Sequence, residues 1–403
     1  MGAISRNLLR GGAAGVLAQS FTLAALLLPI ILGLGSALVI VVQVSAIATV
    51  AIPISTLAVT SILPIASSRT EALRSIALSS SMLIVSTILV GTVVALVGRA
   101  TNSPDFISTA AVTAFLLLAQ GSYYVSTALL TFRLDYQQIM IARLIYGILV
   151  LAFTAVACVL FKSGESIIVA AGSAYLVATF WVMARQTSWF TGSELVGTAP
   201  SRRWRHQLRR SVPLALSFTI GALSGNAAVV VLPVLGDLKP DWAIVIRLAG
   251  GFATVAIQIL APAVDVAIVS GLRERAGKMV RSAFRNSILA GSAIGVVSIV
   301  ASAIGIFWAG SGRLEGAPLL FGLLGYAGFT VAILTCGRTL SMVSSPAVSL
   351  CWEVARFTTV ALCVLYFRSQ TALIAIGTAL TVFAILYWLL VHFGVSRSPK
   401  LRS

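Results

Sequence analysis

The chain has 403 residues, of which 59% are hydrophobic and only 10% are charged, and its mean hydropathy is +1.03. This composition excludes a soluble globular domain and predicts a polytopic membrane protein. The net charge of +17 would point to nucleic acid only if a soluble domain carried a basic face, and the sequence offers none, so nucleic acid is not an expected partner.

Apolar stretches long enough to cross the hydrocarbon as helices recur along the whole chain. They lack the alternating pattern of membrane-spanning strands, which favours helices. We therefore predict an all-α polytopic fold of about twelve transmembrane helices, at residues 12–33, 37–63, 75–97, 107–131, 141–161, 166–184, 213–235, 242–270, 286–309, 317–337, 346–366 and 371–394.

One long polar stretch interrupts this pattern in the middle of the chain. Between Arg202 and Arg210 it holds five arginines and one histidine. We predict three parts from it: an N-lobe of helices 1–6 at residues 1–190, a basic cytoplasmic linker at 191–211, and a C-lobe of helices 7–12 at 212–403. The linker is expected to lie against anionic lipid headgroups rather than to perform chemistry.

The basic residues predict the orientation. With a cytoplasmic N-terminus, the outer side keeps only Arg99, Lys162, Lys239, Arg313 and Arg368, and Arg247 and Arg356 fall inside spans, so 21 of the 28 basic residues are cytoplasmic. The positive-inside rule therefore predicts a multi-pass protein of the inner (plasma) membrane with both termini in the cytoplasm.

The second half resembles the first at an offset near 205. The sequence from Ala48 to Ile52 recurs from Ala253 to Ile257, and five further short matches follow in order. Because six spans is an even number, we expect two parallel six-helix repeats around a central cleft. Small-residue runs at 11–15 and 221–225 would allow close contact between helices.

Four charged residues stand inside predicted spans, where a charge is costly. Arg247 and Asp265 lie on the eighth, and Glu353 and Arg356 lie three residues apart on the eleventh. Arg247 either snorkels to the outer interface or binds a ligand, and Asp265 either pairs with a basic residue such as Arg273 or serves transport. Glu353 and Arg356 form a local ion pair, which is either structural or holds a phosphate-binding arginine while the cleft is empty.

The repeat places these charges in one half only, which favours a role with a ligand over a scaffold role. Gln43, Asn226 and Gln258 are further polar candidates for substrate binding, with hydrogen bonding inside the bundle as the alternative. The four cysteines have no metal-ligand spacing, and neither a phosphate-binding loop nor a catalytic set is present in the sequence. We expect no enzyme activity, no catalytic residues, no metal and no cofactor.

Twelve spans in two halves, a basic residue just before the first helix of each half (Arg10 and Arg210), and the segment from Leu130 to Arg143 resemble a polysaccharide flippase. The family is that of O-antigen and lipid-linked oligosaccharide flippases in the multidrug/oligosaccharidyl-lipid/polysaccharide (MOP) exporter superfamily. The resemblance implies alternating access that moves an undecaprenyl-pyrophosphate-linked oligosaccharide to the outer leaflet for cell-surface polysaccharide biosynthesis. It makes Arg10 and Arg210 candidates for the cytoplasmic entrance, and polysaccharide-assembly proteins candidate partners beside the membrane lipids.

Two alternatives stay open. A cation-coupled multidrug exporter of the MATE type has the same architecture, although that branch typically carries an acidic residue in its first helix and residues 12–33 here hold no charge. A membrane glycosyltransferase or glycan polymerase would need a sizeable outer loop, which the sequence lacks. The sequence does not identify a coupling ion, and Asp265 and Glu353 are the carboxylates that could carry a proton or Na⁺.

Overall fold

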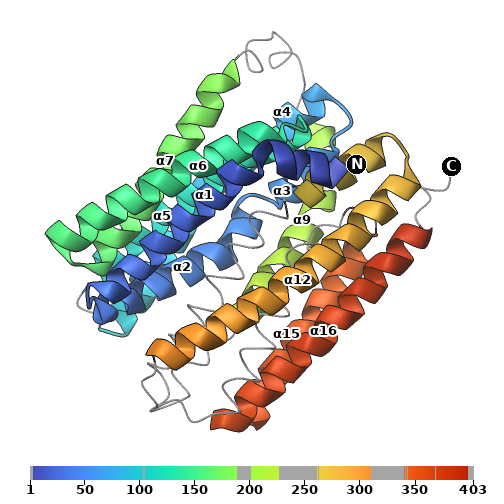
Figure 1. The fold of residues 1–403 in the computed structure, drawn as a ribbon. Helices are drawn as coiled ribbons and strands as arrows, with labels where there is room; N and C mark the ends of the chain where they lie inside the picture. The colour runs from blue at the N-terminus through green and yellow to red at the C-terminus, as the bar shows by residue number, and fades with distance from the viewer. Residues whose placement is uncertain are drawn as a thin grey trace. The chain divides into compact units, whose positions relative to one another are not determined.

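The computed structural model describes residues 3–102, 105–187, 201–226, 261, 263–309, 340, 342, 344–367 and 369–397. These residues are helical nearly throughout and include no β-strand, as predicted (Figure 1). The principal helices are α1 (Ala3–Ile31), α2 (Gly35–Ser55), α3 (Val59–Ile62), α4 (Arg69–Ala100), α5 (Phe106–Phe132), α6 (Tyr136–Val156), α7 (Gly164–Arg185), α9 (Ser201–Gly225), α12 (Gly277–Ala309), α15 (Pro346–Tyr366) and α16 (Ser369–Arg397).

Within the described residues, six helices are long and apolar enough to cross a membrane, and a bent pair formed by Ile40–Ser55 and Val59–Ile65 makes a seventh. The prediction of a multi-pass membrane protein is therefore confirmed. The predicted span at 317–337 and most of the one at 242–270 lie outside the described residues.

The chain divides into two compact units. The N-terminal unit comprises Leu9–Thr219, and the C-terminal unit comprises Met1–Leu8 and Ile220–Ser403. The division falls inside α9, whereas the sequence places the end of the linker at residue 211. Residues 201–211 of that predicted linker are the first turns of α9, so the basic stretch continues into an apolar helix without a break.

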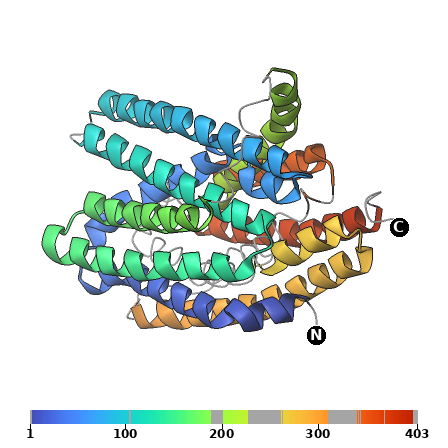
Figure 2. The same ribbon diagram turned by 90° about the horizontal axis from the view of Figure 1, so that it is seen from above.

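Neighbouring helices of the N-terminal unit pack along their lengths. Helices α4 and α5 lie side by side, as Figure 2 shows, and α7 packs against both α5 and α6. Helix α2 contacts α4, α5 and α7. This arrangement buries an apolar core along α5, because Leu116, Leu117 and Leu129 are at most 4% exposed.

Capping residues place the starts of three of these helices. The side chains of Ser68, Asp135 and Ser163 each accept a hydrogen bond from a backbone N–H three residues later, at the first turns of α4, α6 and α7. At α4 Glu71 also reaches back past the N-cap, because its Oε2 accepts a bond of 2.8 Å from the Ser67 backbone N–H. Such bonds satisfy the N–H groups that a helix start leaves without partners.

Small residues bring helices of this unit into close contact. A Cβ atom on Gly147 of α6 would lie 2.5 Å from the backbone carbonyl oxygen of Ala18 on α1. Similarly, a Cβ atom on Gly15 of α1 would lie 3.0 Å from Sδ of Met140 on α6. The contact fits the use of small residues where membrane helices approach each other.

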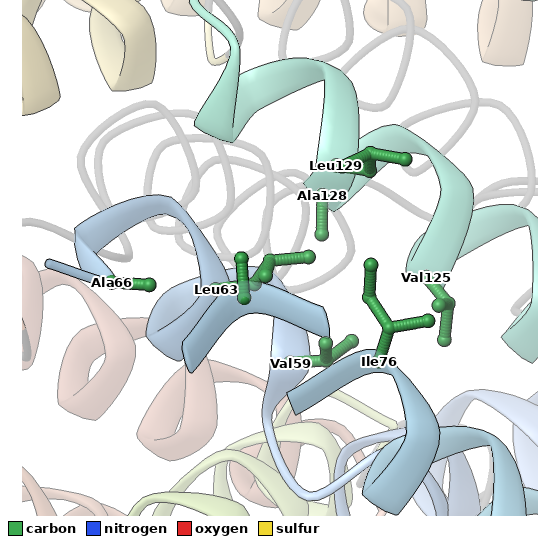
Figure 3. Packing of buried hydrophobic residues seen from close by; sticks show 8 residues of the cluster. Val59, Leu63, Ala66, Ile76, Val125, Ala128 and Leu129 are labelled. Carbon is green, nitrogen blue, oxygen red and sulfur yellow. The ribbon is translucent and has the colours of Figure 1, made fainter. Parts of the chain in front are cut away.

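The second predicted span, at 37–63, is not one straight helix. Helix α2 ends at Ser55, and the chain turns by 53° before Val59. After the turn, α3 and the short 3₁₀ helix η1 (Leu63–Ile65) pack on α4 and α5, where Val59, Leu63, Ala66, Ile76, Val125, Ala128 and Leu129 form an apolar cluster (Figure 3).

Candidate functional site

Helix α15 carries the buried ion pair of the C-terminal unit. Its start at Pro346 agrees with the preference of proline for the first helical turn, because no N–H is lost there. Glu353 and Arg356 follow three residues apart, and Nη2 of Arg356 lies 2.7 Å from Oε2 of Glu353. Since the residues are 7% and 3% exposed, respectively, the predicted ion pair is confirmed and is buried.

Arg356 also bonds to helix α9. Its Nη2 donates a hydrogen bond of 2.6 Å to the backbone carbonyl oxygen of Gly221. Glycine at this position leaves the space that the pair needs, because a Cβ atom on Gly221 would lie 2.7, 2.8 and 2.9 Å from the carboxylate atoms of Glu353. Gly221 belongs to the run of small residues at 221–225 for which the sequence predicts close helix contact.

The aromatic side chain of Trp352 also lies next to the arginine. The guanidinium carbon of Arg356 lies 4.9 Å from the ring centroid of Trp352, a cation–π distance. Trp352 in turn packs 4.9 Å from the ring of Tyr387 on α16, whose hydroxyl accepts a hydrogen bond of 3.4 Å from the backbone N–H of Leu340. The ion pair therefore sits between α9, α15 and α16 in a shell of apolar and aromatic groups.

This arrangement keeps the guanidinium of Arg356 paired with a side chain of the same helix. A guanidinium presents five donors and can bind a carboxylate or phosphate with two of them at once. In the structure Nη2 of Arg356 contacts one carboxylate oxygen of Glu353, so a proton or cation taken up by Glu353 would leave the charge of Arg356 uncompensated. The cluster can thus couple the binding of a cation at Glu353 to the binding of an anionic group at Arg356.

The other predicted site residues do not join this cluster in the described part of the chain. Asp265 is buried, at 6% exposed, in the helical segment 263–273, and it has an interaction partner. Asn226 donates a local hydrogen bond of 2.8 Å from Nδ2 to the carbonyl oxygen of Ala222, and Gln43 is exposed on α2. Arg247 and Gln258 lie outside the described residues.

The sequence predicts Arg10 and Arg210 just before the first helix of each half. In the structure neither residue precedes its helix. Arg10 lies within α1 and Arg210 within α9. Both helices begin several residues before their predicted spans, at 12–33 and 213–235. Arginine has a high helix propensity, so a helix can continue through such residues beyond the apolar core of a membrane.

A tyrosine cluster in the N-terminal unit was not predicted from the sequence. The rings of Tyr146 on α6 and Tyr175 on α7 stack with centroids 4.2 Å apart, and Tyr123 on α5 lies 5.8 and 5.3 Å from them. Tyr124 lies 6.4 Å from Tyr123. The sequence does contain a signal for this cluster, because each of three successive apolar helices carries a tyrosine near its middle.

Comparisons with known proteins support the fold. No family model and no curated protein matches the chain. Among solved structures, an outward-facing multidrug resistance MATE family transporter of the MOP superfamily aligns with 100% of this chain and 97% of its own, at 14% identity and a TM-score of 0.67. A mutant of the Vibrio cholerae MATE transporter VcmN aligns with 100% of both chains, at 16% identity and a TM-score of 0.67.

A third match is a MOP superfamily transporter from Pyrococcus furiosus, described as having a binding pocket of reverse polarity that suggests a different function. It covers 98% of this chain and 96% of its own, at 15% identity and a TM-score of 0.65. The chain therefore has the fold of the MATE transporters.

Proposed function

We propose that the protein is a membrane transporter that exports an organic solute by alternating access, as a cation-coupled exporter of the MATE type. The observation that carries the proposal is the alignment of the complete chain with solved MATE transporters, one of them described as a multidrug resistance transporter. A match over part of the chain would have left room for a different arrangement of the remaining helices.

Glu353 is the proposed coupling residue. It is an acidic side chain buried within an apolar helix bundle, and such residues in membrane proteins commonly mark ion or proton pathways. Arg356 is the proposed sensor of its charge, since the two side chains share a contact of 2.7 Å. In this mechanism the cation neutralises Glu353, and Arg356 then rearranges its bonds to Glu353 and Gly221.

A lipid-linked oligosaccharide flippase is the second candidate, and one feature of the chain favours it. Residues 11–68, which include α2 and most of α1, contain no charged side chain, whereas a buried arginine is present on α15. A buried guanidinium suits an anionic headgroup such as a pyrophosphate better than an organic cation. The Pyrococcus furiosus structure supports a change of polarity on the same fold.

Deletion of the gene separates the two candidates. If the protein exports drugs, the deletion strain gains sensitivity to organic cations such as ethidium and keeps its surface glycan. If it flips a lipid-linked oligosaccharide, that lipid accumulates in the inner leaflet and drug sensitivity is unchanged. If the deletion strain shows neither phenotype, although the parent strain produces the protein in its membrane, the transporter proposal is overturned.

A further inference from the structure

The break between α2 and α3 holds an unusual backbone conformation. Leu57 and Ala58 both have positive φ angles, of 48° and 52°, so two consecutive residues other than glycine lie in the left-handed region. Each such residue stores strain, because its Cβ atom crowds the following carbonyl oxygen. Strain of this kind persists only where surrounding interactions stabilise it, and it clusters at functional sites.

Polar oxygens collect at this break without protein partners. Ser55 and Ser61 stand on either side of it and are 0% and 2% exposed. Neither hydroxyl has a hydrogen-bond partner among the described residues. A buried hydroxyl without a partner destabilises a protein, so two within seven residues of one another are candidates to bind a ligand.

Backbone carbonyls add further oxygens. Three backbone hydrogen bonds turn the chain here. The N–H of Ala58 donates to the carbonyl oxygen of Pro53 at 2.8 Å, that of Leu57 to Ile54 at 3.2 Å, and that of Val59 to Thr56 at 3.0 Å. The carbonyl oxygens of Ser55 and Leu57 accept none of these bonds. The hydroxyl of Thr56 is already used, because it donates to Ile52 at 2.9 Å.

The surroundings are apolar and exclude bulk water. On one side lie the side chains of the cluster in Figure 3, and on another Ala58 and Ile62 pack against Leu214 and Ala215 of α9. No residue from 55 to 59 is more than 4% exposed. The chain carries no charged side chain from residue 11 to residue 68, so no carboxylate of this stretch can serve the site.

We propose that this break binds an alkali-metal cation, with ligands drawn from the hydroxyl oxygens of Ser55 and Ser61 and the carbonyl oxygens of Ser55 and Leu57. Broken membrane helices use unwound carbonyls for this purpose, and the C-terminal end of α2 supplies a partial negative charge. A divalent cation is excluded as the preferred ligand, because neutral oxygens alone do not offset its charge. The site belongs to the N-terminal unit and Glu353 to the C-terminal unit, and the inference does not depend on the proposed transport activity.

The test is thermal unfolding of the purified full-length protein in lipid nanodiscs, in chloride salts of Na⁺, K⁺, Li⁺ and N-methyl-D-glucamine at one ionic strength. We expect one alkali cation to raise the melting temperature in a saturable way that N-methyl-D-glucamine does not reproduce. At 100 times its dissociation constant, a bound cation lowers the unfolding equilibrium constant about a hundredfold. Equal melting temperatures in all four salts would overturn the proposal and leave ordered water as the occupant.

Variants locate the effect. Ser55→Ala and Ser61→Ala should each lower the apparent cation affinity, read from the cation dependence of the melting temperature, at least tenfold. The control is Ser81→Ala, at an exposed serine on α4 whose hydroxyl bonds within its own helix, and it should keep the wild-type affinity. Ala58→Gly relieves backbone strain without removing an oxygen or a large side chain, so it should keep the cation-dependent shift even if a serine variant does not fold. A full shift in folded Ser55→Ala and Ser61→Ala would place the cation elsewhere and refute this site.

Discussion

Arg356 on α15 donates a hydrogen bond of 2.6 Å to the backbone carbonyl oxygen of Gly221 on α9, 135 residues earlier in the chain. The bond ties the buried ion pair of α15 to a position on another helix that only glycine fits. Helix packing and electrostatics of the C-terminal unit are therefore linked at one point, and substitutions on either helix should affect both.

Gly221→Ala should destabilise the C-terminal unit, because its Cβ atom would lie within 2.9 Å of three atoms of the Glu353 carboxylate group. Overpacking of this kind costs about 1–3 kcal/mol. Thermal unfolding in nanodiscs measures the effect, with Leu223→Ala, an exposed position on the same helix, as the control. A melting temperature equal to that of the wild type would show that α9 and α15 separate at little cost.

The ion pair itself can be tested by a double-mutant cycle of Glu353→Gln and Arg356→Gln. Removing one partner of a buried pair leaves the other charge uncompensated and costs about 3–5 kcal/mol. We expect the double variant to be more stable than the sum of the two single changes predicts. Additive effects on the free energy of unfolding would mean that the two side chains do not interact in the membrane.

The position of α15 and the contact of its two charged residues could be predicted from the sequence. The span predicted at 346–366 has the same bounds as α15, because Pro346 starts it and the apolar run ends at Tyr366. The spacing of Glu353 and Arg356 predicted their contact. The bond to Gly221 could not be predicted, since it depends on how two distant helices pack, and the run of small residues at 221–225 indicated only that some helix approaches closely.

The close contact of α1 with α6 predicts a comparable effect in the N-terminal unit. Gly147→Ala would place a Cβ atom 2.5 Å from the rigid backbone carbonyl of Ala18, so the two helices must move apart. The loss of stability should be about 1–3 kcal/mol. Ile148→Ala, at an exposed neighbouring position, is the matched control, and equal melting temperatures for the two variants would argue against the contact.

The break after α2 shows a different limit of sequence reasoning. Pro53 and Pro64 indicate bending, yet positive φ angles usually require glycine or asparagine, and Leu57 and Ala58 carry no such signal. Tertiary packing against α4 and α5 overrides the local preference there. The tyrosine cluster was missed for a related reason, because tyrosines on three helices meet only after the helices pack.

Orientation in the membrane can be checked by labelling. With native cysteines replaced, a cysteine at Lys162 should react with a membrane-impermeant maleimide on intact cells, whereas one at Arg133 should react only after permeabilisation. Both positions are exposed and lie at ends of apolar helices, and the distribution of basic residues predicts opposite sides of the membrane. The reverse labelling pattern would invert the predicted topology.

Ion-coupled transport by the purified protein is the decisive test of the exporter function. In proteoliposomes with an imposed Na⁺ or proton gradient, we predict gradient-dependent movement of ethidium by the wild-type protein and loss of gradient dependence in Glu353→Gln. Ethidium movement no faster than in protein-free liposomes under either gradient, by protein that still unfolds cooperatively, would contradict the exporter function.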